Sequence, residues 1–188
     1  MVRVKKNWNQ DTASRSLAQM ANAIGSTIWK LAANVLLNLE NENFETATQG
    51  QRVDILEEVI CYLVHFCDRW MYPQANQQQR SEFISCLVRD MARMLEDSRV
   101  DVQGEAEYQA AFIDKLNKRA EDYSGFSFSE QEGGSFAMRC RLGAYLQETM
   151  GERDNRWIPD YIVGREAPEI EVALKRSLTG LVNLGSQA

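Results

Sequence analysis

The residues best suited to chemistry lie in the stretch DILEEVICYLVHFCDRWMYP, residues 54–73, which contains the only histidine of the 188-residue chain. If this stretch is helical, side chains four residues apart stack on successive turns. Carboxylate, thiol and imidazole groups then share one stripe, and all three can bind zinc. The candidate binding residues on this polar stripe are Glu57, Glu58, Cys61, His65 and Asp68.

A metal centre at the polar stripe would need more ligands than one helix offers. Zinc sites usually draw three or four ligands from two elements, and a di-iron bundle site needs two Glu-x-x-His motifs. The chain has one histidine, and Cys86 and Cys140 stand alone in the sequence. The sequence therefore predicts neither a metal nor a cofactor.

Three interpretations of the polar stripe stay open. The pattern favours a solvated helix face with local ion pairs, such as Asp68 with His65 one turn before it, because polar helix faces usually meet water. The alternatives are a metal-binding face and a buried polar cluster with a binding role. A catalytic thiolate at Cys61 is disfavoured, since the acids at 57 and 58 would raise its pKa and no helix start is near to lower it.

The elements that would position these groups are helices, because apolar residues recur with a helical period almost throughout the chain. The expected helices span residues 11–39, 51–71, 81–97, 105–123, 135–150 and 168–183, with one short helical piece at 156–164. No stretch shows sustained alternation of period two, and no internal repeat recurs. The sequence thus predicts an all-α single domain, an irregular bundle of about six helices.

Two further features of this domain follow from composition. Residues 1–10 read as a flexible tail, and the Ser- and Gly-rich residues 124–134 form the longest loop. Phe126 and Phe128 in this loop are expected to pack onto the bundle, because loop aromatics usually bury. Apolar residues cover a broad arc of residues 54–72, which predicts that this helix is central.

The first helix carries a heptad seam that favours self-association. Ala18, Ala21 and Gly25 would let two backbones approach closely. The sequence therefore predicts a homodimer, and the alternative is that other helices of the same chain cover the seam. The candidate interface residues are Leu17, Ala21, Ile24, Gly25, Ile28, Trp29 and Leu36.

Composition excludes several classes of function. Acidic residues outnumber basic ones by 27 to 21, which disfavours binding to nucleic acid. No apolar run is long enough for a membrane span, and residues 7–16 are polar where a signal peptide needs an apolar core. The four cysteines form no CxxC pair, so we expect reduced thiols and a cytoplasmic protein.

Two hypotheses of function follow. The first is a non-enzymatic, all-helical interaction or accessory protein that self-associates or docks a protein partner. The alternative is a helical enzyme that binds a metal or a small ligand at the polar stripe around His65.

Overall fold

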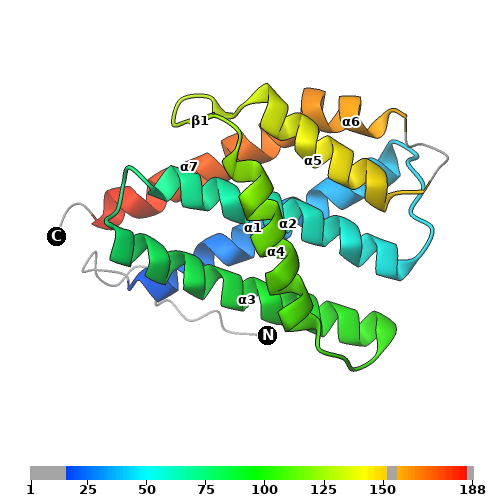
Figure 1. The fold of residues 1–188 in the computed structure, drawn as a ribbon, viewed down its shortest axis with the longest axis horizontal. Coiled ribbons are helices and arrows are strands. Elements are labelled where there is room, and N and C mark those ends of the chain that lie inside the picture. Colours follow the sequence, from blue (N-terminus) through cyan, green and yellow to red (C-terminus); the bar gives the residue numbers. More distant parts are fainter. Residues whose placement is uncertain (1–15, 152–155, 186–188) are drawn as a thin grey trace, which may run out of the picture.

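The computed structural model describes residues 16–151 and 156–185, and it confirms the all-α prediction. Six helices of 14 residues or more pack together, with one short helix and a small hairpin beside them (Figure 1). In chain order the elements are α1 (Leu17–Asn41), α2 (Gln49–Met71), α3 (Gln77–Gln103), α4 (Tyr108–Ser124), β1 (Phe128–Ser129), β2 (Gly133–Gly134), α5 (Phe136–Thr149), α6 (Ile158–Tyr161), the π-helical turn η2 (Ile162–Glu166) and α7 (Ala167–Gly185).

Helix α2 is the central helix, as its broad apolar arc predicts. Sixteen of its 23 residues are buried, and it contacts α1, α3, α4, α5 and α7. Figure 1 shows α4 running across α2 and α3, and both of these helices contact it. The polar residues of α2 therefore have little surface left that faces water.

The heptad seam of α1 packs inside the same chain. Ala21, Ile24 and Ile28 have no exposed surface, and Leu36 is buried with them. A Cβ atom at Gly25 would lie 3.0 Å from the Met91 Cε, so this glycine lets α1 approach α3.

The remaining candidate interface residues, Leu17 and Trp29, are partly buried against the same core. In the structure, α1 is thus an internal core helix, and other helices of the same chain cover its seam. Within the described residues, these are α3 and its neighbours, and the homodimer stays a prediction.

Helix boundaries differ from the prediction mainly at α3. This helix spans residues 77–103 instead of the expected 81–97, and Asn76 is its N-cap: the Asn76 side chain accepts a hydrogen bond from the Gln79 backbone, and the Gln79 side chain accepts one from the Asn76 backbone. Residues 77–80 are all polar, but glutamine and arginine are good helix formers once a capping box starts the helix. The predicted tail 1–10 and the predicted start of the first helix at residue 11 lie outside the described residues.

The loop 124–134 contains a hairpin that the sequence did not predict. Phe128 pairs with Gly134 and Ser129 with Gly133. Phe126 and Phe128 pack against the core as predicted, and the Phe128 ring lies 5.0 Å from the Phe66 ring. Strands of two residues are too short to show alternation, so no period could reveal them.

We expect Gly143→Ala in α5 to lower the free energy of unfolding by about 1 to 3 kcal/mol, the usual cost of overpacking. An added Cβ would lie 2.9 Å from the Pro159 Cα, and backbone atoms of α6 cannot rotate away from it. Urea denaturation measures the effect. Gly180→Ala is the control, since no heavy atom lies within 4 Å of its Cβ position, and helix propensity should make it as stable as the wild type or more so. Equal stability of all three proteins would contradict the close contact of α5 with α6.

Candidate functional site

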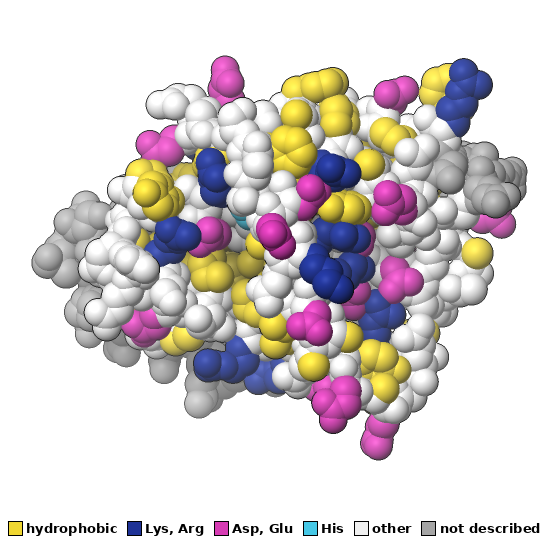
Figure 2. All heavy atoms as spheres, in the orientation of Figure 1, with side chains coloured by type: hydrophobic (Ala, Val, Ile, Leu, Met, Phe, Trp, Pro, Cys, Tyr) yellow, Lys and Arg dark blue, Asp and Glu magenta, His cyan; other side chains and the backbone are white. Residues whose placement is uncertain are grey.

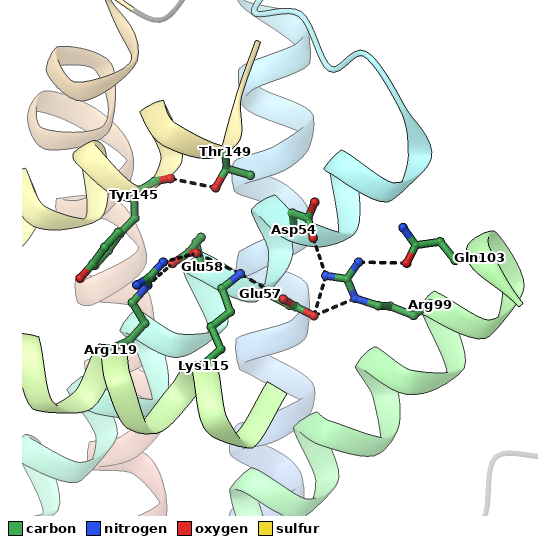
Figure 3. Close-up of polar contacts among 9 residues, drawn as sticks. All are labelled: Asp54, Glu57, Glu58, Arg99, Gln103, Lys115, Arg119, Tyr145 and Thr149. Atoms are coloured by element: carbon green, nitrogen blue, oxygen red, sulfur yellow. Dashed lines mark hydrogen bonds and ion pairs between the residues drawn. The ribbon is translucent and has the colours of Figure 1, made fainter. Parts of the chain in front are cut away.

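The polar stripe of α2 is buried, so the prediction of a solvated face is wrong. Glu57, Glu58, Cys61 and His65 are at most 6% exposed. Helix α4 lies over them, and its cationic side chains point toward α2 (Figure 3). Periodicity separates polar from apolar faces, but it cannot tell a face covered by water from one covered by a charged helix.

Six charged side chains form one cluster between α2, α3 and α4 (Figure 3). Arg119 donates to both oxygens of Glu58, from Nε at 2.8 Å and from Nη2 at 2.9 Å. Lys115 Nζ lies between the two glutamates, 3.0 Å from a Glu57 oxygen and 2.9 Å from a Glu58 oxygen. Arg99 donates to Glu57 from Nε at 2.9 Å and also binds Asp54. The charge cluster comprises Asp54, Glu57, Glu58, Arg99, Lys115 and Arg119, with three charges of each sign.

Contacts within the charge cluster favour the ionised forms of Glu58 and Lys115. Burial alone would raise the Glu58 pKa, but hydrogen bonds from Arg119 and the charge of Lys115 lower it below its ordinary value. Burial would lower the Lys115 pKa, but Glu58 and Glu57 raise it instead. Arg119 also stacks on Tyr145 of α5, with its guanidinium carbon 3.5 Å from the ring centroid. Groups fixed in this way join helices and have no proton to exchange near neutral pH.

His65 lies beyond the charge cluster, at the C-terminal end of α4. Its ring is 5.5 Å from that of Tyr123, the last buried residue of this helix. Burial lowers the His65 pKa to about 4; the charge of Arg69 acts in the same direction and that of Asp68 opposes it. The imidazole is therefore neutral at pH 7.

Asp68 is the one candidate binding residue that the structure separates from the others. It faces the start of α3, where Arg80 Nε donates to Oδ1 at 2.7 Å and Nη2 to Oδ2 at 3.2 Å. The expected pair of Asp68 with His65 is therefore wrong, because a bidentate arginine competes better for the carboxylate.

Cys61 sits in the same buried face and cannot act as a nucleophile there. Burial raises the pKa of its thiol, and Glu58 raises it further. Cys61, Cys67, Cys86 and Cys140 are all free thiols. No group of three or more histidine, cysteine or acidic side chains in the described ranges is placed to hold a metal ion.

A second buried polar cluster, which sequence analysis missed, joins α7 to α5 and the hairpin. Glu171 is buried and accepts hydrogen bonds from Arg139 Nε at 3.0 Å and Nη2 at 2.8 Å, and from the Tyr62 hydroxyl. Arg139 Nη2 also donates to the Glu132 carbonyl at 3.0 Å. The signal was present in the sequence, because position 171 falls on the apolar arc of α7 beside Ile170 and Leu174.

A groove of about 730 Å³ lies between the end of α2 and the start of α3. Its walls include Asp68, Tyr72, Arg80 and Ile84, so the charged groups that line it are already paired with each other. On the face that carries α4, basic and acidic side chains are interleaved and no large area has one sign (Figure 2). Neither feature identifies a ligand class.

Comparison with known proteins adds no identification: the chain matches no family model, and no curated protein and no solved structure resembles it significantly. Among the described helices, none is both long enough and apolar enough to cross a bilayer.

Proposed function

We propose that the protein is a non-enzymatic helical accessory protein that acts by binding a protein partner, with a second copy of the chain as the first candidate. The observation that carries the proposal is that the residues of the polar stripe are already in contact with other side chains of the same chain. Glu57 and Glu58 are each held by two cations, and His65 is buried and neutral. The groups that an enzyme would use here join α2 to α3 and α4.

Exposed aromatic side chains support a role in protein binding. Tyr72, Phe136 and Trp157 are 69%, 71% and 60% exposed. Aromatic residues are enriched at protein interfaces, where their large apolar surfaces supply much of the binding energy. The three residues lie at the end of α2, at the start of α5 and just before α6. None of them belongs to the heptad seam of α1.

Size exclusion with light scattering tests self-association. We expect the mass to rise from 21.5 kDa toward twice that value as concentration increases. Phe136→Ser combined with Trp157→Ser should shift this rise to at least about tenfold higher concentration, since interface aromatics commonly contribute more than 1 kcal/mol each. Lys30→Ser, an exposed change on α1, is the control and should behave as the wild type.

A constant mass of 21.5 kDa at high micromolar concentration would reject self-association. Crosslinking in the native cell then tests a different partner. Identical crosslinked products from the wild type and the double variant would reject the two aromatic side chains as the docking surface.

The alternative, a helical enzyme that binds a metal or small ligand near His65, has one observation in its favour. The Tyr123 hydroxyl is buried beside His65 and has no hydrogen-bond partner among the described residues. An unsatisfied buried hydroxyl is costly, so a bound molecule that accepts a hydrogen bond from it would be stabilised. Elemental analysis separates the two functions for a metal: a stoichiometric transition metal that His65→Ala removes would favour the enzyme.

A further inference from the structure

We propose that α4 is a lid that opens while the rest of the bundle stays folded, and that its opening uncovers the face of α2 from Glu57 to His65. This inference goes beyond partner binding, because it concerns access to an internal face of the protein. It rests on three features of α4: its small apolar contact, its partly hydrated ion pairs and its uncapped N-terminal end.

The apolar contact of α4 is small. Only Phe112, Leu116 and Tyr123 are buried out of 17 residues, whereas α2 buries 16 of 23. Ile113 faces outward and is 39% exposed. A helix with few buried apolar side chains belongs to the part of a protein that opens at low free energy.

Charge provides much of the remaining contact. Lys115 and Arg119 bind the glutamates of α2, yet 24% and 21% of their side-chain surfaces remain exposed. Salt screens such partly hydrated pairs, although less than fully exposed ones. Opening also returns four desolvated charges to water, which offsets part of the lost attraction.

The N-terminal end of α4 lacks a side-chain cap. Before it, Gly104 has a positive φ of 82° and no heavy atom within 4 Å of its Cβ position. The N-cap residue, Glu107, makes no capping hydrogen bond with its side chain. The C-terminal end is held to α5 by Asp122, which binds Arg141 and accepts a hydrogen bond from the Tyr145 hydroxyl, so opening starts at the N-terminal end. Helix ends without caps leave backbone groups unsatisfied and are places where a helix starts to open.

Two cysteines on α2 make the opening measurable. Cys61 has no exposed surface and lies close to Lys115 and Arg119. The positive charges of these two residues partly oppose the rise in its thiol pKa. Cys67 is equally buried, but it lies nine residues after Glu58, which places it on the opposite side of α2. Opening of α4 therefore uncovers Cys61 and leaves Cys67 protected.

The experiment is alkylation of the native protein with a maleimide, with each thiol followed by peptide mass spectrometry. In the wild type we expect Cys61 to react at least about tenfold faster than Cys67, because local opening is more frequent than global unfolding. Raising NaCl from 0.05 to 0.5 M should speed Cys61, and Cys67 should remain at least about tenfold slower than Cys61 at both salt concentrations, because it reacts only on global unfolding. Arg119→Gln should speed Cys61 further at low salt, while the matched variant Arg93→Gln, at an exposed position on α3, should not.

Equal rates for Cys61 and Cys67 in the wild type, changing together with salt, would overturn the proposal, because α4 would then leave only when the whole domain unfolds. The same holds if salt and Arg119→Gln leave the Cys61 rate unchanged. Should Arg119→Gln fail to fold, the salt series on the wild type decides alone.

Discussion

Replacing Glu58 by Gln should lower the free energy of unfolding by about 3 kcal/mol. Glu58 is 2% exposed and binds both Arg119 and Lys115. Removing one partner of a buried ion pair costs about 3 to 5 kcal/mol, because the remaining charges are left desolvated without compensation. We expect the lower end of this range, since both cations keep about a fifth of their side-chain surface in water. Urea denaturation at pH 7 measures the effect.

Arg93→Gln is the control for Glu58→Gln. Arg93 is 64% exposed and lies 3.6 Å from Asp90, so its loss should change stability by no more than about 0.5 kcal/mol. The variant pair Glu58→Gln and Arg119→Gln, alone and combined, isolates the interaction energy between the two residues. Additive effects, or a Glu58→Gln protein as stable as Arg93→Gln, would show that the charge cluster does not stabilise the contact of α4 with α2.

Acid should destabilise the wild type more than His65→Phe, by about 3 kcal/mol between pH 6.5 and pH 4. Burial lowers the His65 pKa from 6.5 to about 4 in the folded protein, and this fall is equivalent to about 3 kcal/mol at 25 °C. Between these two pH values the unfolded chain binds a proton that the folded protein does not. The contribution of neutral His65 is therefore complete above pH 6.5, is lost as the pH falls, and levels off below pH 4.

The comparison uses His65→Phe because phenylalanine keeps a ring against Tyr123 but does not titrate. Carboxylates titrate in the same range in both proteins, so their effect cancels in the difference. Urea midpoints measured at half-unit steps of pH give the two curves. Parallel curves would mean that water reaches His65 in the folded state.

The fold was predictable because the helical spacing of apolar residues, and the polar segments that interrupt it, indicate where helices begin and end. The broad apolar arc of α2 correctly marked it as central, and Phe126 and Phe128 packed as expected. The start of α3 was missed because a capping box at Asn76 outweighs the polar composition of the residues that follow. The hairpin was missed because each strand has only two residues.

The site was less predictable, because burial depends on what covers a face. Glu57 and Glu58 look the same in sequence whether water or Lys115 and Arg119 lie opposite them. One clue was available: a central helix covered on several sides has little polar arc left for water. Likewise, the heptad seam of α1 was correctly identified as buried surface, but no sequence pattern says whether the covering helix comes from the same chain.

The hairpin packs against the second buried polar cluster, which consists of Glu171, Arg139 and Tyr62. This contact restricts which substitutions the chain can accept during evolution. Any side chain at Gly133 or Gly134 would collide with groups of that cluster, since a Cβ at Gly133 would lie 2.5 Å from Glu171 Oε2 and one at Gly134 would lie 2.8 Å from the Tyr62 hydroxyl oxygen. Arg139 would lose its buried anion if position 171 changed alone. Natural substitutions at these five positions should therefore occur together, so that in related sequences glycine at 133 and 134 accompanies tyrosine at 62, arginine at 139 and glutamate at 171.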